Sequence, residues 1–335
     1  MEMRGIVSSI VKVVLPLLLG GAILWWMYRG EDFSQIRHVL TDEMNWTWML
    51  LSFPFGILAQ MFRGWRWRQT LEPTGEQPRT STSINAVFLS YAVSLVIPRI
   101  GEFARCGVLK RYDGVSFSKA LGTVVTERAI DTLVVGGFTG LTLLLYLSVF
   151  GTFFRQTGMS LDTILHGFSL TGYLVAAVCL LAIAVLLHFL FRRLSLYNKV
   201  KVTVGDIWQG VTSLKGVRNL PLFVLFTLGI WVSYFLHYYL TFFCFDFTEH
   251  LGMGCALVTF AVGSIAVIVP TPNGAGPWHF AVKTMLILYG VAEEGALCFV
   301  LIVHTVQTML VAALGLYAFA ALSFTKRINP KTIIV

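Results

Sequence analysis

Charged residues are scarce in this sequence. Only 13% of its 335 residues are Asp, Glu, Lys or Arg, whereas 56% are hydrophobic and the mean hydropathy is +0.75. The surface of a soluble domain needs more charge than this. The composition therefore argues against a soluble protein. It predicts an all-α polytopic membrane protein, with residues 1–335 forming one transmembrane domain.

The recognisable motifs of enzymes and metal sites are missing as well. The five cysteines lie scattered through apolar runs, without the paired spacing of zinc or redox sites. Gly-x-Ser-x-Gly, P-loop and dinucleotide-binding motifs are also absent. We therefore expect no catalytic residue, no metal ion and no cofactor. The net charge of +8 does not indicate a nucleic-acid partner, because the positive residues lie in short loops between apolar runs.

Long apolar runs are what the sequence has in abundance. A transmembrane helix needs about 17–25 mostly apolar residues, and we predict about six full spans on this basis. They cover residues 7–28, 46–62, 120–150, 164–191, 220–243 and 296–324. The first run resembles a signal peptide after Arg4 and Lys12, but it has no small-residue cleavage site. We expect it to remain as the first span.

Two further apolar runs are interrupted before they can cross a bilayer. The run from Ile84 stops at Pro98 and Arg99, and the run from Cys255 stops in a stretch rich in Pro and Gly that begins at Pro270. Helices broken at membrane depth are tolerated where they line a cavity or are buried in protein. We therefore predict two re-entrant helical hairpins, each of which enters and leaves the membrane on the same side.

The distribution of positive charge selects this topology. With two re-entrant hairpins, both termini face the cytoplasm, and twenty of the 25 Lys and Arg residues fall on the cytoplasmic side. If the broken segments crossed fully, the basic segment 99–119 would lie outside. The order of spans and hairpins then repeats with opposite orientation, in residues 7–150 and 164–324. This is an inverted-topology repeat, which in transporters places the binding site where the broken helices meet.

Candidate site residues gather around both breaks. Near the first break, charged residues occur at membrane depth, where they are costly unless they face a cavity or one another. They are Arg99, Glu102, Arg105, Glu127, Arg128 and Asp131. Near the second break the candidates are Pro272, Asn273, Gly274, Gly276, His279, Lys283 and His304. Glu127 and Asp131 lie four residues apart, as do His304 and Thr308 in the counterpart span.

The charged cluster near the first break has two interpretations. Its three positive and three negative residues would neutralise one another as ion pairs that pin a hairpin to the neighbouring helix. Alternatively, its arginines would bind an anionic head group, since guanidinium matches phosphate geometry. His279 and Lys283 would form a second polar patch or a proton relay with Glu127 or Asp131, but the sequence favours the alternative of a buried histidine with satisfied hydrogen bonds.

An alternation of arginine and aromatic residues follows the second span. Trp and Arg at the end of a span are typical of an anchor at the lipid head groups. We therefore expect Arg66 and Arg68 to lie at the inner membrane surface, outside any cavity; direct contact with a lipid phosphate is the alternative.

Three motifs, in order, connect the chain to a known family. They are Pro98-Arg-Ile-Gly-Glu-Phe-Ala-Arg105, Glu127-Arg-Ala-Ile-Asp131 and Pro270-Thr-Pro-Asn-Gly-Ala-Gly276. With them the chain resembles the flippase-like integral membrane family, the family of the transmembrane region of lysylphosphatidylglycerol synthase. The resemblance covers nearly the whole chain and implies lipid translocation. The chain has His279 where many members have Glu, and it shows no counterpart of the soluble aminoacyl-transferase domain, so synthase activity is not implied.

These observations lead to one main functional hypothesis and two alternatives. We expect a non-enzymatic transporter of the bacterial cytoplasmic membrane that moves an anionic phospholipid or a polyprenyl-linked sugar phosphate between leaflets. One alternative is a proton- or ion-coupled transporter of small solutes. The other is an intramembrane lipid-modifying enzyme that uses His279 or His304 as a base. The lipid species, the direction and energy source of transport, and a homo-oligomeric state are left open.

Overall fold

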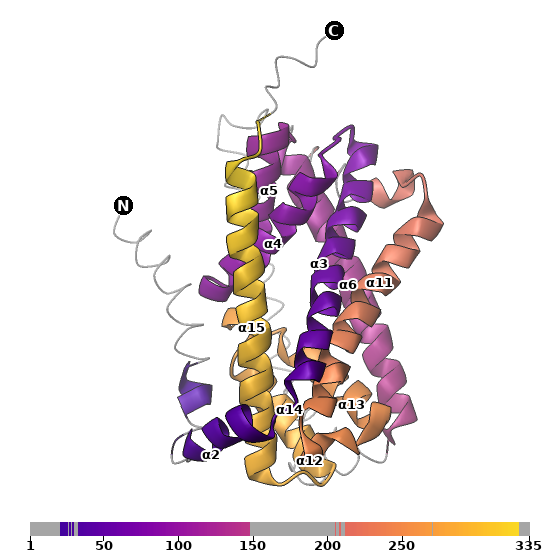
Figure 1. Ribbon diagram of the computed structural model, residues 1–335. Helices are drawn as coiled ribbons and strands as arrows, with labels where there is room; N and C mark the ends of the chain where they lie inside the picture. The colour runs from indigo at the N-terminus through magenta and orange to yellow at the C-terminus, as the bar shows by residue number, and fades with distance from the viewer. Residues whose placement is uncertain are drawn as a thin grey trace, which may run out of the picture.

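The protein is described here from a computed structural model. The structure describes residues 33–147, 212–269 and 271–327, together with 21–25, 27, 29, 205 and 208. All regular elements in this part of the chain are helical (Figure 1). The α-helices are α2 Phe33–His38, α3 Trp46–Leu71, α4 Thr80–Val96, α5 Gly101–Asp113, α6 Phe117–Leu145, α11 Leu220–Tyr239, α12 Asp246–Glu249, α13 Gly252–Ala266, α14 Pro277–Leu288 and α15 Glu293–Ser323. Short helical turns are η1 Val39–Glu43, η2 Glu72–Thr74, η3 Ser213–Gly216, η4 Leu240–Cys244 and η5 Pro272–Gly274.

Three of these helical segments are long and apolar enough to cross a membrane. They are Phe117–Leu145, Leu220–Cys244 and Glu293–Ser323, which confirm the predicted spans at 120–150, 220–243 and 296–324. Helix α3 covers the predicted span 46–62 and continues to Leu71. The predicted span 164–191 and most of the first, 7–28, lie outside the described residues. The chain is thus a multi-pass membrane protein.

Helices α4 and α5 form a hairpin that ends where the sequence is interrupted. A residue before proline disfavours helical backbone angles, and Ile97, before Pro98, is extended. Arg99 completes the turn with a positive φ of 64°. Helix α5 then starts at Gly101, where a β-carbon would collide with the Ser90 carbonyl oxygen of α4. Glycine at this position therefore allows the two helices to pack closely.

Helices α13 and α14 form a second hairpin with a more irregular turn. Asn273, Gly274 and Gly276 all have positive φ, with values of 51°, 74° and 91°. Asn and Gly are the residues that adopt this backbone conformation at least cost. Helix α14 begins directly afterwards at Pro277, whose fixed φ suits the first position of a helix.

The two hairpins start from opposite ends of the helix bundle. Figure 1 shows α4 and α5 in one half and α13 and α14 in the other, while α3 and α15 run along both. At one end the Arg79 side chain donates a hydrogen bond to the Lys326 carbonyl, which places the start of α4 beside the end of α15. At the other end the backbone N–H of Asn45, just before α3, donates to the Cys244 carbonyl at the end of η4. The turns of both hairpins therefore point toward the middle of the bundle.

Each hairpin has its own apolar core. Around the first hairpin, Trp67, Leu109 and Val124 belong to one buried cluster. Around the second, Phe242 and Phe299 belong to another, with many aromatic members. The four described cysteines are buried and free; they are Cys106, Cys244, Cys255 and Cys298.

Candidate functional site

The turns of the two hairpins meet. The Arg99 guanidinium donates a 3.0 Å hydrogen bond to the Ile268 carbonyl oxygen, just after the end of α13. Between the turns lies a cavity of about 210 Å³, which we call the tip cavity. It is lined by Ser90, Tyr91, Ser94, Pro98, Arg99, Glu102, Arg128, Val267, Val269, Thr271, Asn273 and Gly274. Both sequence interruptions thus contribute to one cavity.

A second cavity of about 310 Å³ adjoins the first. Tyr91, Val267 and Asn273 belong to the linings of both. Its other walls come from α3, α11, α13, α14 and α15, and many are aromatic, so we call it the aromatic cavity. These residues are Gly56, Gln60, Trp231, Tyr234, His237, Tyr238, Phe260, Gly263, Ser264, Trp278, His304, Gln307, Leu310 and Val311.

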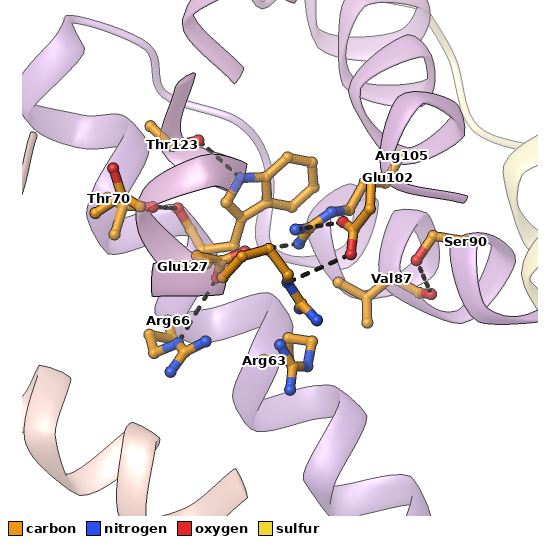
Figure 2. A network of polar contacts seen from close by, with 12 residues as sticks. Arg63, Arg66, Thr70, Val87, Ser90, Glu102, Arg105, Thr123 and Glu127 are labelled. Atoms are coloured by element: carbon orange, nitrogen blue, oxygen red, sulfur yellow. Dashed lines mark hydrogen bonds and ion pairs between the residues drawn. The ribbon is translucent and has the colours of Figure 1, made fainter. Parts of the chain in front are cut away.

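Beside the tip cavity, two acidic residues of α6 are buried among arginines. Asp131 accepts hydrogen bonds from Arg63 at 2.5 Å and from Arg66 at 2.8 Å. Glu127 is fully buried and accepts a 2.7 Å bond from Arg105 of α5, while Arg66 lies 3.7 Å from its other oxygen. Figure 2 shows Arg66 reaching Glu127 from one side, with Arg105 and Glu102 on the other. Helices α3, α5 and α6 are therefore joined by short, buried ion pairs.

Arg105 is buried and has several close partners. Besides Glu127 it pairs with Glu102 at 2.7 Å, and its guanidinium lies over the Trp67 ring, 4.5 Å from the centroid. The Trp67 indole in turn donates to Thr123 at 3.0 Å. A guanidinium bound this closely has little freedom to take a new ligand.

Arg128 differs from these buried arginines. Its side chain is 42% exposed, and it lies 3.4 Å from Glu102 and 3.3 Å from Asp131. These distances are longer than the 2.7–2.9 Å that is usual for charge-assisted hydrogen bonds. Arg99 is also exposed and contacts the second hairpin instead of the acidic residues. The six predicted residues are therefore divided between a tightly paired interior and a loose edge at the cavity.

The expectation for Arg66 was wrong. Its side chain is completely buried and paired with acidic residues of α6, so it is not an anchor at the membrane surface. Arg63, one turn earlier, is equally buried, and sequence reasoning did not include it in the site. Arg68 is partly exposed and lies 3.6 Å from Glu72, which agrees with a position outside the cavities. The signal that could have found Arg63 and Arg66 is their three-residue spacing after Gln60, which places all three on one side of α3.

The second hairpin contributes neutral polar groups. The Asn273 side chain donates a 2.7 Å hydrogen bond to Thr308, and its carbonyl oxygen lies 3.0 Å from His304 Nε2. His304 and Thr308, four residues apart on α15, thus hold the turn in place. Pro272 and Gly274 lie in the same turn, and the Gly276 amide donates to His279 Nδ1 at 3.3 Å.

His279 and Lys283 do not share one polar patch. The His279 ring lies beside the His304 ring, with centroids 4.4 Å apart. Lys283 instead forms a 2.6 Å ion pair with Glu293 at the start of α15, and it lines neither cavity. Within the described residues, no three His, Cys, Asp or Glu side chains come together as a metal site requires.

Comparison with known proteins places the chain in a family. The family model described as "Lysylphosphatidylglycerol synthase TM region" matches residues 13–315. The chain belongs to this family. No curated protein and no solved structure matches it. The family match thus includes both hairpins, both cavities and the buried ion pairs.

Proposed function

We propose that the protein is a non-enzymatic transporter that moves an anionic phospholipid or a lipid-linked sugar phosphate between the leaflets of the bacterial cytoplasmic membrane. The observation that carries this proposal is the charge balance of the tip cavity. Its charged lining residues are two arginines, Arg99 and Arg128, and one acid, Glu102. The family name also refers to a protein that makes a modified membrane lipid.

The loose edge of the ion-pair network supports binding of phosphate. Arg128 is partly exposed and forms only long ion pairs, and Arg99 holds only a backbone carbonyl in the contacts described above. Guanidinium presents a planar fork that fits two phosphate oxygens. An entering phosphate would bind both arginines without breaking the shorter pairs of Arg63, Arg66 and Arg105. Those pairs keep the cavity in shape.

The proposal includes the membrane topology that the sequence predicts. Both hairpins re-enter the bilayer, one from each side, and the two halves of the chain form an inverted-topology repeat with cytoplasmic termini. Glu127 and Asp131 on α6 then correspond to His304 and Thr308 on α15. In transporters with this architecture, the binding site lies near the membrane midplane, between the broken helices. The head group enters the tip cavity while the acyl or prenyl chains remain in lipid.

The test is a lipid-translocation assay in reconstituted vesicles. The wild-type protein should move labelled phosphatidylglycerol, which is anionic, much faster than zwitterionic phosphatidylcholine. The double variant Arg99→Gln/Arg128→Gln should lose this anionic transport while inserting normally. Arg111→Gln is a matched control, because Arg111 lies on α5 and lines neither cavity. Equal rates for both lipids, or full activity in the double variant, would contradict the proposal.

A further inference from the structure

The aromatic cavity has unused hydrogen-bonding groups. Gln60 is buried, with only 3% of its surface exposed. Its Oε1 atom has no hydrogen-bond partner among the described residues. The indole N–H of Trp231 is also buried and unpaired in this part of the chain. Both residues line the aromatic cavity. Buried polar groups are nearly always paired, so an acceptor and a donor left unpaired at one cavity point to a ligand that supplies both.

The same cavity is electrically neutral. Among the described residues that line it there is no Asp, Glu, Lys or Arg. The Arg63 guanidinium lies 5.9 Å from the ring centroid of Tyr91, which is on the wall shared with the tip cavity. A cationic group would meet this arginine and find no carboxylate. A second phosphate would find no positive lining residue.

A hydrocarbon chain fits the cavity no better. It would cover Gln60 Oε1 and the Trp231 indole without bonding to either, which is unfavourable for buried polar groups. A sugar-like ring satisfies both requirements. Its hydroxyl groups donate and accept hydrogen bonds, and its C–H faces pack on the electron-rich faces of rings such as Tyr234 and Trp278. The volume of about 310 Å³ suits one small ring and not a whole lipid.

We infer that the aromatic cavity binds the neutral polyhydroxylated part of a lipid head group whose phosphate occupies the tip cavity. This inference rests on the proposed function and narrows its substrate class to lipids that carry a sugar or polyol ring on phosphate. The two cavities share Tyr91 and Asn273, so phosphate and ring lie side by side as they do in such a head group. Gln60 lines the aromatic cavity, and Arg63, three residues later on α3, binds Asp131.

Native mass spectrometry of lipid binding to the protein in phosphatidylcholine nanodiscs tests the assignment. No sugar-based detergent is used, because it would compete for the aromatic cavity. The probes are phosphatidic acid, phosphatidylinositol, a polyprenyl phosphate hexose and an uncharged monohexosyl diacylglycerol. Both lipids that carry a ring on phosphate should bind about tenfold more tightly than phosphatidic acid, since each added neutral hydrogen bond contributes modestly. Whichever binds more tightly, phosphatidylinositol or the polyprenyl phosphate hexose, shows whether the protein prefers a diacylglycerol or a polyprenyl lipid.

Three variants localise the effect. Gln60→Leu should weaken binding of the ring-bearing phospholipids about tenfold and leave phosphatidic acid within about twofold. Trp231→Phe, which keeps an aromatic ring, should cause a smaller loss with the same selectivity. Gln69→Leu is the matched control, because Gln69 is on the same helix, its Oε1 is also buried and unpaired in the described structure, and it lines neither cavity.

The outcomes separate this inference from the proposed function. Phosphatidic acid binding as tightly as the ring-bearing phospholipids, or equal effects of Gln60→Leu and Gln69→Leu, would overturn the inference and leave the transporter in place. If Gln60→Leu fails to insert, Trp231→Phe decides the same question. Binding of the uncharged hexosyl lipid, sensitive to Gln60→Leu, without binding of phosphatidic acid would keep the ring site and contradict the anionic substrate.

Discussion

The two hairpins have the same arrangement of helices but opposite chemistry. The first is surrounded by charge, and its neighbourhood contains Arg63, Arg66, Glu102, Arg105, Glu127, Arg128 and Asp131. The second is surrounded by aromatic rings that meet mostly edge to face, such as Tyr238 with Trp278 and Phe242 with Phe299. Its turn is held by the side-chain amide of Asn273, the ring of His304 and the hydroxyl of Thr308. The helix arrangement therefore does not require charge, and the charge of the first hairpin needs a reason of its own.

The charged residues beside the first hairpin do not all have the same role. Glu127 and Arg105 are fully or almost fully buried and form short contacts, so their pairing stabilises the packing of α5 on α6. Arg128 is exposed at the cavity and forms long contacts. The buried interior of the cluster agrees with the structural interpretation, and its edge is where we propose that phosphate binds.

The largest expected effect comes from breaking a buried ion pair beside the first hairpin. Arg105→Leu leaves Glu127 without its closest partner, and removing one member of a buried pair costs about 3–5 kcal/mol of stability. Thermal unfolding of the purified protein measures this loss. The double variant Arg105→Leu/Glu127→Leu should lose clearly less than the sum of the single variants, because the unpaired buried charge disappears. Additive losses would show that the two side chains are not coupled.

The arginines of α3 show where sequence reasoning reached its limit. Proline, glycine and the end of each apolar run located both hairpin turns, because helix termination is a local property. The four-residue spacing of Glu127 and Asp131 placed both correctly on one helix face. Arg66, in contrast, pairs with Asp131, which lies 65 positions later in the chain. Its local surroundings of Trp and Arg are the same as those of a surface anchor, so only the tertiary contact distinguishes the two.

Arg99 shows a second limit of the same kind. It lies three residues before Glu102, a spacing that favours pairing on a helix. The helix begins only at Gly101, however, and Arg99 has the positive φ of the turn, so its guanidinium contacts Ile268 of the other hairpin. Residue spacing predicts neighbours only inside a regular element.

The second expected effect concerns the turn of the second hairpin, which is held by uncharged groups. Asn273→Ala removes the hydrogen bond to Thr308. It also places alanine at a positive φ, which asparagine tolerates better. Together the two effects should cost about 2–3 kcal/mol of stability. Asn273→Gly loses the same hydrogen bond but relieves the backbone, so it should be the more stable of the two in thermal unfolding. The opposite order would mean that backbone strain does not contribute to this turn.

The smallest expected effect sharpens the division within the charged cluster. Arg128→Gln removes a partly exposed charge with loose contacts, and such pairs contribute about 0–1 kcal/mol to stability. Its unfolding temperature should therefore stay close to that of the wild type, while Arg105→Leu lowers it strongly. A large loss of stability in Arg128→Gln would assign this arginine to the structural interior as well.

The most direct measurement is an experimental structure of the protein in nanodiscs that contain an anionic phospholipid. The account predicts head-group density in the tip cavity, with phosphate oxygens within about 3 Å of the guanidinium groups of Arg99 and Arg128. The pairs of Arg105 with Glu127 and of Arg66 with Asp131 should remain unchanged beside it. A tip cavity without lipid phosphate, with bound head groups only on the outer faces of the helices, would contradict the central claim.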